Sequence, residues 1–144
     1  MLVADGWQVR GTSRSPAGVA AIEAAGLEGA QADPQRVGTI LEQVGDVAVV
    51  VWALASAAGS AQALAAVHGP RLEHLLQRLV DTPVRGFVYE ASGTAPAEAL
   101  SAGAALVREA GARWRIPVAV INAEPGDAAW TVAAAEATRR VLDR

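Results

Sequence analysis

The sequence predicts an α/β protein, in which helices cover both faces of a five-stranded parallel sheet in a three-layer sandwich. Short β-branched runs alternate with longer alanine-rich stretches along the 144 residues, a pattern typical of βαβ units. The run 47–54 is apolar without interruption, as expected for a parallel strand that is covered on both faces. A chain of this length is expected to form one domain, residues 1–144.

Ten elements are expected, and strands alternate with helices throughout. The predicted strands span residues 8–13, 27–32, 47–54, 86–91 and 117–122. The predicted helices span residues 16–25, 34–44, 61–80, 97–114 and 127–142. The third helix is expected to break at Gly69 and Pro70, and Asp127 is the expected cap of the last. We expect right-handed crossovers between the parallel strands.

Capping residues locate the ends of the first two helices. Ser15 is a favoured cap, Pro16 suits the first helical position because its missing N–H needs no partner there, and Gly26 suits the C-terminal end. Asp33 followed by Pro34 repeats the cap-plus-proline signal. These residues therefore predict helix starts at 16 and 34.

Three absences in the composition exclude classes of chemistry. The chain has no cysteine, which excludes disulfides, thiolate metal sites and a cysteine nucleophile. All twelve basic residues are arginine, which excludes Schiff-base chemistry and the phosphate-binding lysine of a P-loop. The two histidines, His68 and His74, exclude a histidine-rich metal site.

Charge and hydropathy limit the partners and the compartment. The net charge of −3 gives no electrostatic case for binding nucleic acid. The longest uncharged apolar run, 47–58, is too short to span a membrane. The first residues lack the basic region and apolar stretch of a signal peptide. We therefore expect a cytoplasmic protein with no nucleic-acid or membrane partner.

Several segments, in order, resemble the short-chain dehydrogenase/reductase superfamily, and most closely its extended and atypical branches of the NAD-dependent epimerase/dehydratase type. The matching segments are Leu2 to Arg14, Asp33, Val50 to Ala55, Arg85 to Gly93 and Arg115 to Ile121. These segments are spread along nearly the whole chain, so the resemblance extends over most of its length. The resemblance implies a Rossmann-like fold and an NAD(P) cofactor.

The resemblance also implies particular site residues. The implied cofactor-binding residues are Thr12, Ser13, Arg14, Asp33, Ala53, Ala55 and Asn122. Arg14 lies in the loop that meets the adenosine ribose, where an arginine favours the 2′-phosphate of NADP(H); the alternative is a solvated loop arginine. Asp33 corresponds to an acidic residue near adenine, and the alternative is a helix cap. Ser92 lies at the family's catalytic serine position, and the alternative is a serine that ends a strand before a turn.

The chain departs from the family at the residues that perform the chemistry. No two of its fourteen glycines lie two apart, so the Gly-x-Gly-x-x-Gly turn that approaches the pyrophosphate is absent. The family's tyrosine/lysine pair is also absent, because the chain has no lysine and its one tyrosine, Tyr89, falls in a predicted strand. We therefore expect a protein that is catalytically impaired or inactive.

The family's central first strand has no counterpart in this chain. We expect the sheet to close by direct pairing of strand 8–13 with strand 47–54, which gives the order 2-1-3-4-5. Contact of Val9 with Val49 or Val50 would show this closure. The competing hypotheses are that the protein starts upstream of Met1, or that a partner supplies the strand.

Three functions follow. The first is an NAD(P)-binding protein of the epimerase/reductase type, with NADP(H) as its ligand. The second is a non-catalytic interaction or scaffold subunit with no bound nucleotide, for example a homodimer through apolar helices or sheet edges. The third is a hydrolase or transferase in which His68 or His74 approaches Ser92, an arrangement that the direction of the helices disfavours.

Overall fold

The computed structural model describes residues 2–126 and 128–143, and it shows parallel strands alternating with helices. The strands are β1 (Arg10–Ser13), β2 (Glu28–Gln31), β3 (Val49–Trp52), β4 (Gly86–Glu90) and β5 (Val118–Ile121). The helices are α1 (Pro16–Ala24), α2 (Val37–Leu41), α3 (Ala61–Val67), α4 (Pro70–Leu79), α5 (Ala97–Trp114) and α6 (Ala128–Leu142). Every predicted strand and helix is present, and the expected break at Gly69 and Pro70 separates α3 from α4.

The strands form two separate parallel sheets, so the predicted single five-stranded sheet is wrong. β1 pairs with β2, and β4 lies between β3 and β5. β1 and β3 are not paired, and the expected pairing of Val9 with Val49 or Val50 is absent. A cavity of about 310 Å³ has both strands in its lining. At the amino ends of the two strands, the Arg10 side chain extends from β1 to the carbonyl of Gln43 and to Asp46, ahead of β3.

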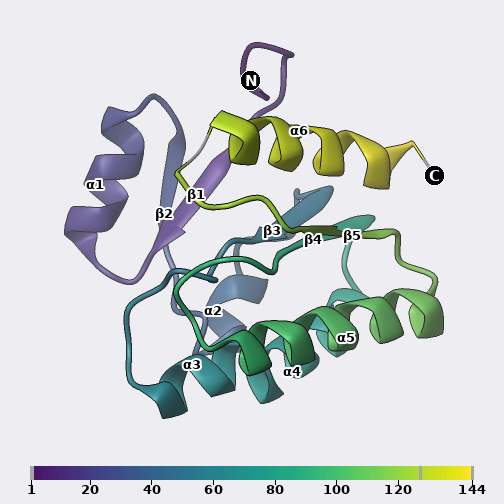
Figure 1. The fold of residues 1–144 in the computed structure, drawn as a ribbon. Helices are drawn as coiled ribbons and strands as arrows, with labels where there is room; N and C mark the ends of the chain where they lie inside the picture. The colour runs from purple at the N-terminus through teal and green to yellow at the C-terminus, as the bar shows by residue number, and fades with distance from the viewer. Residues whose placement is uncertain (1, 127, 144) are drawn as a thin grey trace.

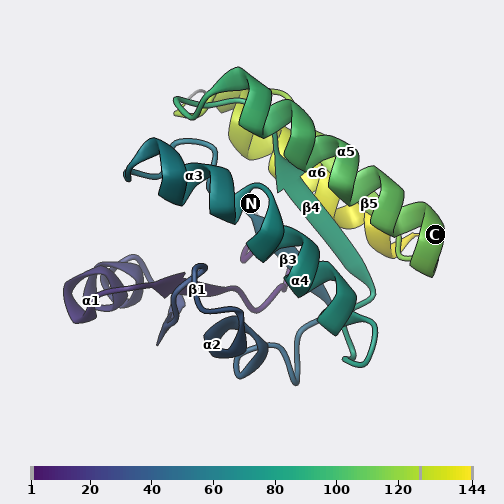
Figure 2. The ribbon, with the colours of Figure 1, turned by 90° about the horizontal axis from the view of Figure 1, so that it is seen from below.

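Helices cover both faces of the three-stranded sheet. Figure 1 shows α6 on one face of this sheet and α4 and α5 on the other, while α1 lies beside β1 and β2. Figure 2, from below, shows the two-stranded sheet with α1 and α2 set to one side of the three-stranded sheet. The helix α4 buries four leucines in the larger core: Leu72, Leu75, Leu76 and Leu79. No helix within the described residues is long and apolar enough to cross a membrane.

The capping signals gave one correct helix start and one wrong one. The Ser15 hydroxyl accepts a hydrogen bond from the Gly18 N–H at 3.1 Å, and Gly26 follows α1 with a φ of 85°, as predicted. By contrast, α2 begins at Val37 rather than at residue 34. Asp127, the expected cap of α6, lies outside the described residues.

The later start of α2 has a local cause. Asp33 Oδ1 accepts from the Gln35 N–H at 2.9 Å, which closes a turn before the helix. The Thr39 hydroxyl accepts from the Asp33 N–H at 2.8 Å and lies 2.7 Å from the Arg36 carbonyl. These side-chain bonds give the backbone of residues 33–36 partners other than a helical ladder, so the proline signal marks a turn here.

Candidate functional site

The carboxyl ends of β1, β2 and β3 surround a small cavity that contains two of the predicted site residues. Arg14 follows β1 and Asp33 follows β2, and both line this cavity of about 120 Å³ together with Leu54, which follows β3. In parallel α/β proteins, ligands bind in crevices at the carboxyl ends of the strands. The cavity is therefore a candidate ligand site, and we call it the Arg14 cavity.

The two charged residues of the Arg14 cavity differ in how they are used. The guanidinium of Arg14 is exposed and makes no ion pair or hydrogen bond with a described residue. Asp33 is half-buried and uses one carboxylate oxygen for the turn bond to Gln35. Arg14 is thus the free cation of this cavity among the described residues, while Asp33 has a structural role that leaves its second oxygen for a ligand.

Three other implied cofactor residues, Thr12, Ser13 and Ala53, lie outside the lining of the Arg14 cavity. Thr12 and Ala53 line the larger cavity between β1 and β3, which shares Pro34 and Leu54 with the Arg14 cavity and therefore adjoins it. The Ser13 hydroxyl accepts from the Ser15 N–H at 3.4 Å, in the turn before α1.

Ala55 is fully buried, so its side chain is not accessible to a ligand. Its N–H donates to the carboxylate of Glu90 at 2.9 Å, and its carbonyl accepts from the Ala95 N–H at 2.8 Å. Ala55 lies in the loop after β3, and its two backbone groups therefore hold this loop to β4 and to the loop that follows β4.

Ser92 and Asn122 lie together in another cavity, which Arg14 does not line and which we call the second cavity. This cavity of about 360 Å³ lies where β4 and β5 end, and Arg108 of α5 also lines it. The Ser92 hydroxyl donates to the Glu124 carboxylate at 2.9 Å. The structure thus separates the predicted residues, with Arg14 and Asp33 at one cavity and Ser92 and Asn122 at another.

His68 and Tyr89 form a buried pair that sequence reasoning did not identify. The Nδ1 atom of His68 lies 2.7 Å from the Tyr89 hydroxyl, and Nε2 lies 3.2 Å from the Leu54 carbonyl. A carbonyl only accepts, so Nε2 carries the proton and Nδ1 accepts from the tyrosine. Burial lowers the pKa of His68 and raises that of Tyr89, so the pair is neutral.

The buried pair removes the hydrolase hypothesis. Both ring nitrogens of His68 are engaged inside the core, and His74 lies exposed on α4. The hydrogen-bond partner of Ser92 is Glu124 rather than a histidine. The arrangement of nucleophile and orienting base that acyl-transfer catalysis needs is therefore not formed by the described residues.

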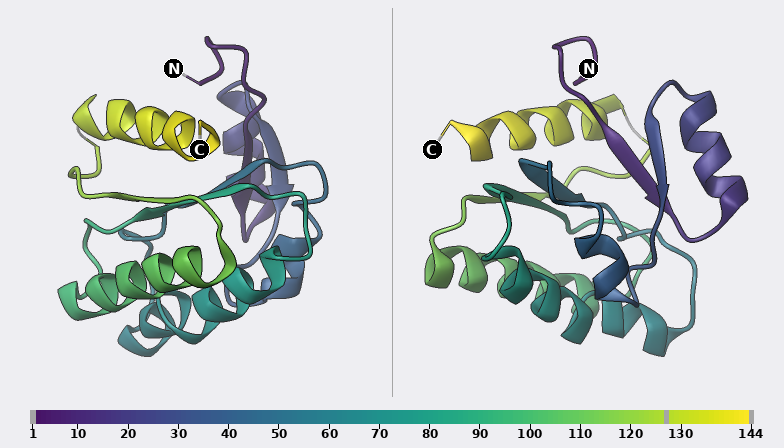
Figure 3. Two further views of the ribbon diagram at one scale, coloured as in Figure 1. Left: turned by 90° about the vertical axis from the view of Figure 1, so that its right-hand side faces the viewer. Right: turned by 180° about the vertical axis from the view of Figure 1, so that it is seen from behind.

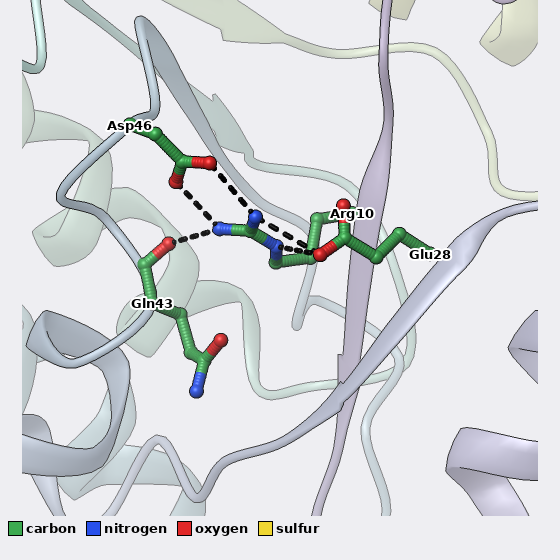
Figure 4. Close-up of polar contacts among 4 residues, drawn as sticks. All are labelled: Arg10, Glu28, Gln43 and Asp46. Carbon is green, nitrogen blue, oxygen red and sulfur yellow. Dashed lines mark hydrogen bonds and ion pairs between the residues drawn. The ribbon is translucent and has the colours of Figure 1, made fainter.

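A cluster around Arg10 ties the amino ends of the two sheets together (Figure 4). The Arg10 guanidinium donates to the carboxylate of Asp46 at 2.8 and 3.0 Å, to the Glu28 carboxylate at 3.0 Å and to the Gln43 carbonyl at 2.7 Å. The bond to Asp46, followed by that to Glu28, raises the pKa of Arg10, and the same guanidinium lowers the pKa of Asp46. The sequence signal for this cluster was an arginine inside a predicted strand.

Comparison with known proteins gives no further assignment. No protein-family model matches the chain, and no curated protein matches its sequence. Within residues 2–126 and 128–143, no group of histidine, aspartate and glutamate side chains is arranged to hold a metal ion. The functional assignment therefore depends on the geometry of the chain itself.

Proposed function

We propose that this chain is a Rossmann-like nucleotide-binding protein related to the NAD-dependent epimerase/dehydratase type of the short-chain dehydrogenase/reductase superfamily. In this proposal it binds the adenosine 2′-phosphate end of NADP(H) and does not catalyse hydride transfer. The observation that carries the proposal is the unpaired Arg14 guanidinium at the carboxyl ends of β1 and β2, beside a cavity. A free arginine at this edge is suited to a phosphate on the ribose 2′ position.

The residues present fit one end of the dinucleotide and not the other. Arg14 offers a planar cation to the 2′-phosphate, and the second oxygen of Asp33 is free to accept from the adenosine. The adjoining cavity, which would receive the pyrophosphate, is lined mainly by aliphatic side chains and has no glycine-rich turn. A glycine-rich turn before a helix would direct several N–H groups at one pyrophosphate, and most of the residues that line this cavity lie instead in β1 and β3 or next to them.

The groups that catalysis requires are also out of place. The Tyr89 hydroxyl is buried and bonded to His68, and burial raises its pKa. Ser92 lies in the second cavity and donates to Glu124. Both hydroxyls are engaged with other side chains, and the chain has no lysine to pair with the tyrosine, so the proton transfer that accompanies hydride transfer has no tyrosine/lysine pair to perform it. This supports binding without turnover.

Calorimetric titration of the full chain with 2′,5′-ADP tests the proposal, because this ligand carries the 2′-phosphate without the pyrophosphate bridge. We expect saturable binding to be tighter for 2′,5′-ADP than for 5′-ADP. Arg14→Ala should weaken it by roughly 10- to 100-fold, since hydrogen bonds to charged groups are worth about 1.5–3 kcal/mol.

Arg71→Ala is the matched control, because Arg71 is exposed on α4 and does not line the Arg14 cavity. This variant should bind 2′,5′-ADP like the unmodified chain. Absence of binding, or equal loss in the Arg14 and Arg71 variants, would refute the nucleotide proposal. The same result would leave the interaction subunit as the remaining function, a candidate that the open space between the two sheets favours.

A further inference from the structure

The facing edges of the two sheets enclose a space that we call the inter-sheet slot. Its two sides are β1 and β3, and neither strand has a partner on the side that faces the other. Two cavities of about 310 Å³ each have residues of both strands in their lining, and the two share Arg10, Val47, Val49 and Val51. Figure 3 shows the two-stranded sheet set apart from the three-stranded sheet, with no strand between them.

Both edges of the slot present unpaired backbone groups. The carbonyls of Val9 and Ser13 accept bonds from β2, and successive residues of a strand direct their backbone groups to opposite edges, so Arg10 and Thr12 face the slot. The Ala48 carbonyl accepts from the Arg85 N–H beside β4. By the same alternation, the odd-numbered residues of β3 face the slot. Strand edges of this kind are templates for pairing with another extended chain.

Aliphatic and aromatic side chains contribute to both faces of the slot. One cavity is bordered by Ile40 and Val44 near α2, and by Val50 and Trp52 of β3. The other is bordered by Trp7, Val9, Val49 and Val51, with Thr138 of α6. Val51 is 38% exposed, although it lies in the middle of a strand run of four apolar residues. Because side chains of a strand alternate between faces, an inserted strand would place successive side chains into one cavity and then the other.

Direction and charge further define the occupant. Arg10 and Asp46 bring the amino ends of β1 and β3 together, while Arg14 and Leu54 line one cavity at their carboxyl ends. β1 and β3 therefore run the same way, and a strand between them would be parallel to both. The rim at the amino end holds one cation between two carboxylates, those of Asp46 and Glu28. This excess of one negative charge favours a basic residue at the start of the occupant.

We propose that the inter-sheet slot binds an extended, β-branched segment of another polypeptide, which completes a continuous parallel sheet by strand addition. The segment begins with a basic residue and continues with about four apolar residues, matching the four-residue lengths of β1 and β3. Strand addition supplies main-chain hydrogen bonds for affinity and alternate side-chain contacts for specificity. Arg10 gives up part of its contact with Asp46 as the basic residue enters.

A second copy of the folded chain does not suit the slot. Each described strand is already paired within a sheet and flanked by helices. The edge of an intact sheet would bring its own helices to a slot that Thr138 of α6 and Ile40 of α2 already border. The occupant is a segment that is extended and unpaired before it binds.

The probe is an acetylated peptide, Arg-Val-Thr-Val-Ile-Val, joined to fluorescein through a glycine-serine linker, and the measurement is fluorescence anisotropy with the full chain. We expect saturable binding. N-methylation of the central valine amide should weaken it about fivefold or more, because it removes one main-chain donor worth about 1 kcal/mol. The reversed peptide sequence should also bind more weakly, because the slot specifies a parallel strand.

Two substitutions locate the binding. Val51→Asp places a charge in the slot and should reduce affinity at least tenfold, whereas Val80→Asp, at a position 47% exposed after α4, should not. In the unmodified chain, saturating peptide should slow hydrogen exchange at the amides of Thr12 and Val51, a readout that does not depend on the stability of a variant. Absence of binding, equal binding of the N-methylated peptide, or unchanged exchange at these amides would overturn the proposal. The proposal would also be overturned if the chain alone forms a dimer and Val51→Asp dissociates that dimer, because the slot would then bind a second copy.

Discussion

Removing the Tyr89 hydroxyl tests the buried pair that joins the α3–α4 junction to the sheet. In Tyr89→Phe the aromatic ring stays in place, and the Nδ1 atom of His68 loses the hydroxyl 2.7 Å away, which is its one hydrogen-bond partner among the described residues. His68 and Tyr89 are 1% and 0% exposed, so water cannot replace the hydroxyl without a rearrangement. An unsatisfied buried acceptor costs about 1–3 kcal/mol. For a chain of this size, we expect the Tm to fall by roughly 4–12 °C.

Thermal and urea unfolding, followed by circular dichroism, measure this loss. The double-mutant cycle with His68→Phe supplies the control, because Tyr89→Phe removes no bond to a ring nitrogen in that background. The coupling free energy of the two residues should be about 1 kcal/mol or more. A Tyr89→Phe variant as stable as the unmodified chain, with no coupling to His68, would refute the assigned hydrogen bond and tautomer.

Two further predictions concern the same buried region. Burial lowers the pKa of His68, so below pH 6.5 the unfolded chain binds a proton that the native chain does not, and the free energy of unfolding should fall as the pH decreases. In urea unfolding, His68→Phe should flatten this part of the pH profile. A profile that the substitution leaves unchanged would contradict the prediction. Gly103→Ala would place a Cβ 2.1 Å from the Tyr89 hydroxyl oxygen and should destabilise the protein by about 1–3 kcal/mol. Gly38→Ala, in α2 with nothing within 4 Å, should instead be neutral or slightly stabilising, and equal effects of the two alanines would count against the packing described.

Local patterns in the sequence predicted the elements but not the arrangement of the sheets. The strand predicted from the apolar run 47–54 and the break at Gly69 and Pro70 both depend on neighbouring residues, and the structure confirms both, with β3 spanning Val49–Trp52. Strand order depends on contacts between distant residues. The Arg10 cluster joins residues up to 36 positions apart, and no local pattern shows that this side chain would span two strands.

The candidate site was predictable to a similar extent. Arg14 and Asp33 follow adjacent parallel strands, so their meeting at one cavity follows from the direction of the strands. The separation of Ser92 from them does not, because it depends on how the two sheets are placed. The partners of His68 were also out of reach, since Tyr89 and Leu54 lie 21 and 14 residues away along the chain.

The separation of β1 from β3 can be tested directly with paired cysteines, because the native chain contains none. Adjacent strands lie about 4.8 Å apart, whereas a slot one strand wide separates them by about 9.6 Å, beyond the reach of a disulfide. The pair Thr12→Cys and Ala30→Cys, at partnered positions of β1 and β2, serves as the positive control. Under mild oxidation this pair should form a disulfide, and Thr12→Cys with Val51→Cys should not, although a bis-maleimide of about 10 Å should link the second pair. Equally rapid disulfide formation in both pairs would show that β1 and β3 are neighbours and would contradict the account.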